Sequence, residues 1–154
     1  CLGMQIAIME FARDACGMVG ASSTEFDPHT AYPVIDIMED QQGKVQTGGT
    51  MRLGGYPCRL AEGTQARALY GQEMITERHR HRFEVNNNFL PPMLEAGLVV
   101  AGVNPQRNLV EAIELRDHPF FVGVQFHPEF KSRPNRPHPL FAGFIAAAVR
   151  SLEK

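Results

Sequence analysis

Three residues at opposite ends of the sequence carry groups that could together perform nucleophilic catalysis. Cys1 opens the chain, and His127 and Glu129 lie far downstream in the tripeptide His-Pro-Glu. In an extended chain, residues two apart point to the same side, so the Glu129 carboxylate can orient the His127 imidazole. A neighbouring imidazole favours the thiolate, which is the reactive form of cysteine. The set therefore matches a nucleophile, a base and an orienting acid.

The same residue types also have simpler interpretations. A single cysteine is more often a small buried apolar residue, and a His-Pro-Glu tripeptide also arises by chance. We interpret Cys16 and Cys58 as structural. Three cysteines are too few, and odd in number, for a disulfide framework. This usage is typical of a reducing compartment.

A run of alternating arginine and histidine, residues 78–82, offers a second place for chemistry. A guanidinium presents a planar fork of donors to a carboxylate or phosphate, so one arginine could bind such a group. His79 and His81 could instead be two metal ligands on one face of a strand, but no cluster at metal spacing completes a site nearby. We therefore predict no metal. The run has no helical apolar face and is expected to be extended or looped and partly solvated.

The elements around these residues can also be predicted. Met4, Ile8, Phe11 and Ala15 recur at helical spacing, and Gly17 follows where a glycine cap would end a helix. Cys1 would then lie at a helix N-terminus, where the positive end of the dipole favours a thiolate. Residues 17–33 have no period and form a longer loop than most connections, so we expect function there.

The remaining chain predicts strands and a closing helix. Two short alternating runs around Gly54-Gly55, within residues 50–60, predict a hairpin with Pro57 in an edge strand. A short helix at 91–96 precedes three apolar strand candidates at 98–103, 110–115 and 120–126, the last continuous enough for a sheet interior. Pro139 opens an amphipathic helix that would place Phe144 and Ile145 in the core.

Composition excludes several classes of protein. The 154 residues are 44% hydrophobic and 21% charged, as expected for one globular domain. A formal charge of −2 provides no field that would recruit nucleic acid or an anionic membrane. No apolar run approaches the roughly 18 to 20 residues of a membrane span. We expect a cytoplasmic protein that was processed at Cys1 or is a fragment, because the sequence lacks an initiator Met.

Two widely separated motifs resemble a known family. Cys1-Leu2-Gly3-Met4-Gln5 and, far downstream, residues 125–130 are similar to the triad-type, class I glutamine amidotransferases. Residues 23–28, 48–54, 77–86 and 127–141 narrow the resemblance to the glutaminase domain of CTP synthases. It spans essentially the whole chain. It implies an α/β fold with a three-layer α/β/α sheet. Residues 1–154 would be the C-terminal portion of the glutamine amidotransferase domain, starting at the nucleophile, with the family's N-terminal strands missing.

The resemblance also implies roles for individual residues. Cys1 would be the nucleophile, His127 the general base and then acid, and Glu129 its orienting partner. Glu25 suits the ammonium group of the substrate L-glutamine, and Arg82 suits its carboxylate. The full set of residues implied to hold the substrate is Leu2, Gly3, Met4, Gln5, Glu25 and Arg82.

The family's reaction has two stages. The cysteine thiolate attacks the side-chain amide of L-glutamine, ammonia leaves, and water hydrolyses the glutamyl thioester. The ammonia then reaches a separate synthetase domain, where ATP and Mg²⁺ activate UTP for amination to CTP and GTP acts as activator. The family forms homotetramers through that domain. The resemblance therefore implies that UTP, ATP, GTP and Mg²⁺ bind outside this chain, which would hold no cofactor itself.

The sequence departs from the family pattern at its start. The first half of the Gly-x-Cys-x-Gly elbow and a glycine-rich loop that completes the oxyanion hole precede the nucleophile in the family. The backbone N–H of Leu2 would supply one donor, and losing the other typically costs on the order of 10² to 10³ in rate. We therefore expect the isolated 154 residues to be a poor glutaminase.

Two other functions stay open. An amidotransferase with a processed N-terminal cysteine would use the α-amino group of Cys1 as its base and leave His127 and Glu129 idle. A non-catalytic regulatory or assembly module would retain the fold and have an unreactive Cys1.

Overall fold

The computed structural model describes residues 1–37 and 51–153. Its helices are α1 (Leu2–Cys16), α2 (Gln65–Tyr70), α3 (Leu90–Glu95) and α4 (Pro139–Leu152), with 3₁₀ helices η3 (Asn87–Phe89) and η4 (Pro128–Phe130). Its strands are β1 (Ser22–Ser23), β2 (Pro33–Ile37), β3 (Arg52–Leu60), β4 (Met74–His81), β5 (Phe83–Val85), β6 (Leu98–Asn104), β7 (Leu109–Leu115) and β8 (Val122–Val124).

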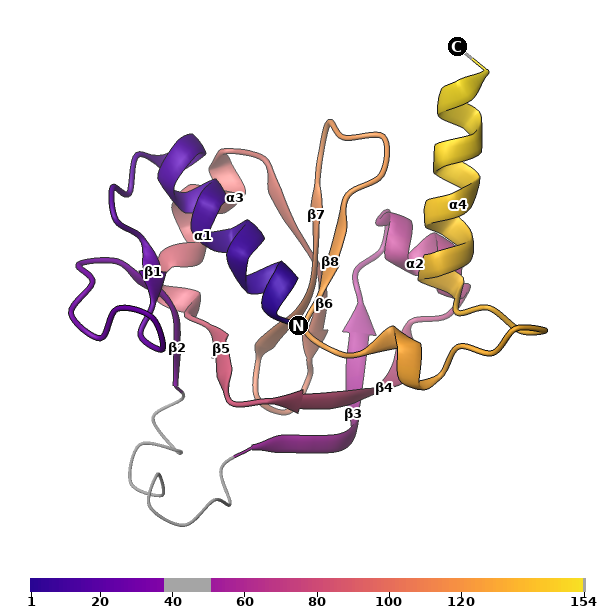
Figure 1. The fold of residues 1–154 in the computed structure, drawn as a ribbon, viewed down its shortest axis with the longest axis horizontal. Helices are drawn as coiled ribbons and strands as arrows, with labels where there is room; N and C mark the ends of the chain where they lie inside the picture. The colour runs from indigo at the N-terminus through magenta and orange to yellow at the C-terminus, as the bar shows by residue number, and fades with distance from the viewer. Residues whose placement is uncertain (38–50, 154) are drawn as a thin grey trace.

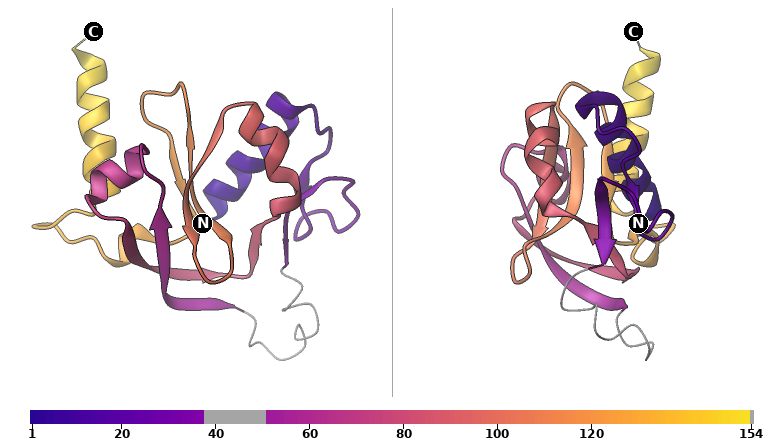
Figure 2. Two further views of the ribbon diagram at one scale, coloured as in Figure 1. Left: turned by 180° about the vertical axis from the view of Figure 1, so that it is seen from behind. Right: turned by 90° about the vertical axis from the view of Figure 1, so that its left-hand side faces the viewer.

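The strands form two sheets, and helices cover both sides of the larger one. The larger sheet has the order β4-β3-β6-β7-β8 with antiparallel neighbours, and the smaller has the order β1-β2-β5. Figure 1 shows α4 standing at one end of the molecule beside α2. The side view in Figure 2 shows α1 and α3 on opposite sides of β7 and β8. This arrangement agrees with the predicted α/β class.

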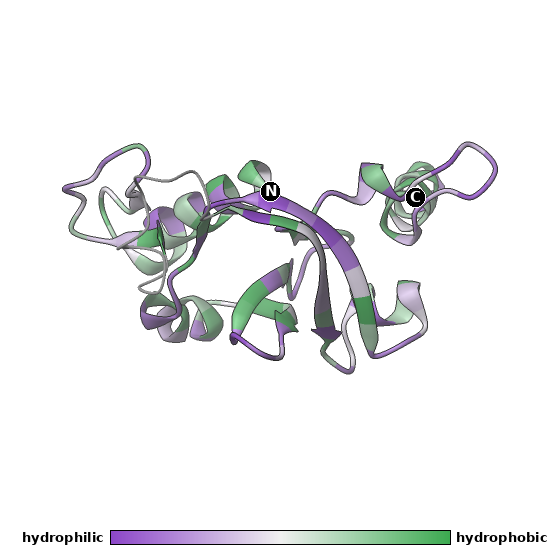
Figure 3. Ribbon diagram, turned by 90° about the horizontal axis from the view of Figure 1, so that it is seen from below, coloured by the Kyte–Doolittle hydropathy of each residue, from purple (hydrophilic) through white to green (hydrophobic). Residues whose placement is uncertain are grey.

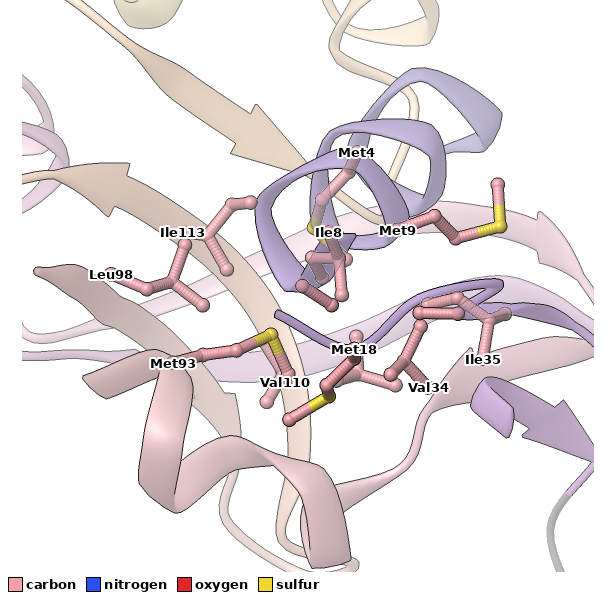
Figure 4. Close-up of a cluster of buried hydrophobic side chains, with 13 residues drawn as sticks. Met4, Ile8, Met9, Met18, Val34, Ile35, Met93, Leu98, Val110 and Ile113 are labelled. Atoms are coloured by element: carbon pink, nitrogen blue, oxygen red, sulfur yellow. The ribbon is translucent and has the colours of Figure 1, made fainter. Parts of the chain in front are cut away.

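Helix α1 forms as its sequence predicts. Gly17 ends it in the left-handed conformation, with φ of 65°, and donates its N–H to Ala12 O. The apolar face of α1 packs into the larger of two core clusters, shown in Figure 4. Side chains of α1, β2, α3, β6 and β7 meet there, among them Met4, Ile8, Ile35, Met93, Leu98 and Ile113. The same packing fixes the position of Cys1 at the start of the helix.

The predicted hairpin at Gly54-Gly55 is wrong. The structure has one strand, β3, that pairs continuously with β4 from Arg52 opposite His81 to Arg59 opposite Met74. Gly54 has a φ of 99° and bends the strand instead of reversing it. The resulting curvature of β3 and β4 is visible in Figure 3. Thr50, the first residue of the predicted hairpin segment, lies outside the described residues, as do Gly48 and Gly49 of the motif at 48–54.

Strand β3 is also not an edge strand, because it lies between β4 and β6. Only Arg59 and Leu60 of β3 pair with β6, so at Pro57 the strand β3 is paired with β4 on one side and not with β6 on the other. Proline, which lacks an N–H, is tolerated there for this reason.

Strand β8 was predicted to lie inside a sheet, but it is the outermost strand of the larger sheet within residues 1–37 and 51–153. It is also shorter than predicted and only half-buried. The predicted loop at 17–33 contains the two-residue strand β1, and β2, which begins at Pro33, was not predicted. Short strands of two to five residues give too few alternations to be read from the sequence.

The closing helix α4 begins at Pro139 as predicted, and Leu140 joins the second core cluster, but the rest of its apolar face is not in the core. Phe144 and Ile145 are 56% and 60% exposed. Gly143 is buried as well, because it faces Leu69 of the neighbouring α2 so closely that an added Cβ would lie 2.5 Å from a Leu69 methyl. Among the described residues, no helix is long and apolar enough to cross a membrane.

Candidate active site

Cys1 occupies the N-cap of α1. Its backbone nitrogen donates to Val124 O at 2.6 Å, at the end of β8, and its carbonyl accepts the first helical bond from Gln5 N at 3.2 Å. The first turn of a helix carries N–H groups without helical partners, and the helix dipole is positive there. The thiol therefore lies where a negative charge on sulfur, or on a group bonded to it, is stabilised.

His127 and Glu129 form the predicted pair. His127 Nδ1 lies 2.6 Å from Glu129 Oε1. A carboxylate can only accept, so Nδ1 carries a hydrogen and donates it, and in this tautomer of the imidazole the lone pair is on Nε2. Nε2 is buried and has no hydrogen-bond partner among the residues that the structure describes. The ring therefore offers a base that is oriented by Glu129.

Local structure holds this pair in place. His127 is the N-cap of η4, and its backbone N–H donates to Arg78 O of β4 at 2.8 Å. The ring stacks on Phe130 with centroids 5.1 Å apart. Partial burial raises the pKa of Glu129, but the hydrogen bond and charge of His127 outweigh burial and hold this pKa below its usual value. Glu129 is thus ionised at neutral pH.

Cys1 and the His127–Glu129 pair belong to one neighbourhood. Gln125, two residues before His127, places its side-chain Nε2 3.4 Å from Cys1 Sγ. The carboxylate of Glu129 also lies close enough to act electrostatically on the Cys1 nitrogen. The two ends of the sequence therefore meet at the end of β8.

A pocket of about 370 Å³ opens beside Cys1. It brings together five of the residues predicted to form the site: Cys1, Leu2, Gln5, Glu25 and Arg82. Its other lining residues are Met51, Arg80, His81 and Phe83. Gly3 and Met4 do not line it, because Gly3 is exposed elsewhere on the helix and Met4 is buried in the core. His127 and Glu129 are also outside its lining.

Of the charged residues that line the pocket, Glu25 is the carboxylate, and Arg80 and Arg82 are the guanidinium groups. Arg82 lies between β4 and β5, and Glu25 lies in the turn after β1, where its N–H donates to Ser23 Oγ at 3.2 Å. Both side chains are exposed and free of the buried ion pairs nearby. A pocket lined by a carboxylate and by guanidinium groups suits a ligand that carries both an ammonium and a carboxylate group.

A buried charged cluster lies beneath this pocket. Arg52 bonds Glu84 at 3.0 Å and Glu111 at 2.6 Å, and His81 bonds Glu84 at 2.8 Å. Burial, reinforced by the charges of Arg52 and His81, lowers the pKa of His79 to about 2, so this ring is neutral. The run at 78–82 was expected to be partly solvated. This holds only for alternate residues, because the histidines of β4 point inward and its arginines point outward.

Several of these residues were missed by sequence reasoning. Gln125 was quoted only as part of a motif, and Met51 and Phe83 were not assigned to the site. The inward orientation of His79 and His81 follows from the period of two in β4, which the uniformly polar composition concealed. Within residues 1–37 and 51–153, no group of three or more histidine, cysteine or acidic side chains could hold a metal ion.

Comparison with known proteins identifies relatives over nearly the whole chain. The family model described as glutamine amidotransferase class-I matches residues 1–147. The CTP synthase of Moorella thermoacetica is 59% identical over 150 residues, which are 97% of this chain and 28% of that protein. The CTP synthase of Rubrobacter xylanophilus is 60% identical over 154 residues, which are 100% of this chain and 28% of that protein.

A solved structure supports the same relationship. The glutaminase domain of Trypanosoma brucei CTPS, with bound acivicin, superposes with a TM-score of 0.91 and 37% identity. The match covers 97% of this chain and 58% of that one. The chain thus spans less than a third of the curated relatives and just over half of this solved domain.

Proposed function

The chain belongs to the class I glutamine amidotransferases, and on that premise we propose that its pocket binds L-glutamine and that Cys1 hydrolyses the side-chain amide of this substrate. The observation that carries the proposal is the meeting of Cys1 with Glu25 and Arg82 in one pocket, next to an oriented imidazole. The acivicin bound to the T. brucei glutaminase domain supports it.

The charges of the pocket support recognition of an amino acid. The Arg82 guanidinium would hold the α-carboxylate of glutamine, and the Glu25 carboxylate would hold its α-ammonium. With both ends of the amino-acid group fixed, the side chain extends toward Cys1. The backbone of Leu2, Gly3 and Met4 and the side chain of Gln5 would complete the proposed binding set, with Met4 acting through its backbone because its side chain is in the core.

The proposed chemistry begins with the Cys1 thiolate. Sγ attacks the amide carbon and forms a C–S bond, and the charge that develops on oxygen is met by the free N–H groups at the start of α1. The C–N bond then breaks, and His127, which took the thiol proton of Cys1 when the thiolate formed, gives this proton to the leaving ammonia. The product is a glutamyl thioester on Cys1.

Hydrolysis completes the cycle. His127 takes a proton from water, the resulting hydroxide attacks the thioester carbon, and the C–S bond breaks to release glutamate and the Cys1 thiolate. Glu129 holds the imidazole in the tautomer with hydrogen on Nδ1 and stabilises the imidazolium form. Atoms and protons balance as glutamine plus water giving glutamate plus ammonium.

For the intact protein we propose the activity of a CTP synthase. Ammonia from glutamine would be used for the ATP-dependent amination of UTP to CTP in a synthetase domain of the same protein, with GTP as activator. Residues 1–154 would be the C-terminal portion of its amidotransferase domain. UTP, ATP, GTP and Mg²⁺ would bind in the synthetase domain, outside this chain. We further propose a cytoplasmic homotetramer.

The test uses the intact protein and two cysteine variants. Cys1→Ser should abolish release of ammonia from glutamine while leaving CTP formation from added ammonium salts. Cys16→Ser is the matched control, since Cys16 lies in the same helix and is also a half-buried free thiol. Glutamine-dependent activity that survives in Cys1→Ser would contradict the proposal.

A further inference from the structure

A continuous chain of hydrogen bonds connects β5 to the sulfur of Cys1. Gln5 Nε2 donates to Phe83 O at 2.9 Å and to Gln125 Oε1 at 3.2 Å. Gln125 Nε2 in turn lies 3.4 Å from Cys1 Sγ. Gln5 and Gln125 are 3% and 0% exposed, so water does not compete for these bonds.

The direction of this chain is fixed by the backbone. The oxygen and nitrogen of a side-chain amide are hard to distinguish, so their assignment must follow from their partners. Phe83 O can only accept, so Gln5 must present its NH₂ group there. The same NH₂ group faces Gln125, which must therefore present Oε1 to it. The NH₂ group of Gln125 is then the end that faces Cys1 Sγ.

The position of Gln125 is also determined by its backbone. Its N–H donates to Glu111 O of β7 at 2.9 Å, and the preceding residue, Val124, accepts the backbone N–H of Cys1 at 2.6 Å. The amide donor and the sulfur are thus held on the same short segment of structure. An N–H group that is buried and preorganised in this way stabilises negative charge without reorientation.

We propose that Gln125 is a further catalytic residue, whose side-chain N–H donates a hydrogen bond to Cys1 Sγ and stabilises the thiolate as nucleophile and as leaving group. The inference rests on the proposed role of Cys1. A neutral thiol is a weak acceptor and a thiolate a strong one, so the bond favours the thiolate over the thiol. The same bond assists when the C–S bond of the thioester breaks, because sulfur regains its negative charge.

The experiment measures alkylation of Cys1 by iodoacetamide against pH in the intact protein, with the modified cysteine identified by mass spectrometry. Gln125→Met has a similar length and no donor. A hydrogen bond to a charged group has a strength that corresponds to about one pH unit, so the midpoint of alkylation should rise by about that much. At a pH below both midpoints, Gln125→Met should be alkylated roughly tenfold more slowly than the wild type. At a pH well above both midpoints, the two proteins should be alkylated at the same rate.

A second variant keeps the rest of the chain of bonds. Gln125→Glu can still accept from Gln5 Nε2, but its ionised carboxylate cannot donate to sulfur and adds negative charge. Its midpoint should therefore rise further than that of Gln125→Met. Convergence with the wild-type rate at high pH shows that both variants retain an intact, accessible Cys1, which a purely structural effect of the substitution would not give.

Gln72→Met is the matched control, because Gln72 is exposed, is distant from Cys1 in the sequence and does not line the pocket beside Cys1. Its midpoint should equal that of the wild type. Unchanged midpoints in both Gln125 variants, with a wild type that hydrolyses glutamine, would overturn the role of Gln125 alone. A wild type that releases no ammonia from glutamine would instead contradict the proposed function.

Discussion

Replacement of Glu129 by glutamine isolates the contribution of its charge to the proposed catalysis. Glu129→Gln keeps an oxygen that can accept from His127 Nδ1, so the tautomer of the ring is retained. It removes the negative charge that would stabilise the imidazolium. The bond it replaces is short, with 2.6 Å between Nδ1 and Oε1. We expect a reduced kcat for glutamine hydrolysis with little change in KM, because Glu129 does not line the substrate pocket.

The size of the effect follows from exposure. Two unit charges about 4 Å apart interact by about 1 kcal/mol in water and about 4 kcal/mol near a protein surface. The Glu129 side chain is 55% exposed and that of His127 25%, so solvent screening favours the lower half of this range. A loss of about 1 to 2 kcal/mol corresponds to a roughly 5- to 30-fold lower kcat. Glu129→Ala also frees the ring to change tautomer and should lose roughly another tenfold.

The assay is glutamine-dependent ammonia release by the intact protein at saturating glutamine. Glu10→Gln is the matched control, since Glu10 pairs with Arg13 at 2.6 Å and has a 53% exposed side chain, but lies on an outer face of α1. It should leave kcat unchanged. The reasoning is refuted if Glu129→Gln is as impaired as His127→Ala, or if Glu129→Ala retains the wild-type kcat.

Three further predictions concern the substrate and stability. Arg82→Met and Glu25→Gln should each raise KM for glutamine about tenfold or more while Cys1 keeps its reactivity toward iodoacetamide, and an unchanged KM would contradict their roles. The pKa of His79 is lowered from 6.5 to about 2, so the folded state binds fewer protons than the unfolded state between these pH values. The titration of His79 should therefore leave the free energy of unfolding unchanged above pH 6.5 and should lower it by up to about 1.4 kcal/mol per pH unit below pH 6.5. Hydrogen exchange of β4 should show this slope, and His79→Leu should remove it. Gly102→Ala should destabilise the fold by about 1 to 3 kcal/mol in thermal unfolding, because the new Cβ would lie 2.7 Å from Cys58 Sγ; an unchanged melting temperature would show that this contact relaxes freely.

The elements near the proposed nucleophile could be predicted from the sequence because their signals are local. Helix α1 has both an apolar period and a terminal glycine, and the His-Pro-Glu segment carries its geometry within three residues. The pairing of Cys1 with this segment could be proposed only from residue types and family resemblance, since no local pattern links Cys1 to residues 127–129.

The errors arose where tertiary contacts override local preference. The pair Gly54-Gly55 resembles a hairpin turn, but pairing with all of β4 keeps β3 continuous and turns the glycines into a bend. Phe144 and Ile145 have the spacing of core residues, yet α4 contacts α2 through Gly143 and leaves them exposed. Gln125 acts through an amide chain whose members are distant in sequence, so only the folded structure shows its contact with sulfur.

The central claim is that Cys1 forms a covalent bond with the carbonyl carbon of glutamine. The most direct measurement is an acid quench of the intact protein during turnover of glutamine, followed by digestion and mass spectrometry of the cysteine peptides. We predict a glutamyl adduct on Cys1, absent from Cys16 and Cys58, and increased in a His127 variant that hydrolyses the thioester slowly. Ammonia release without any adduct on Cys1, or an adduct on another residue, would contradict the account.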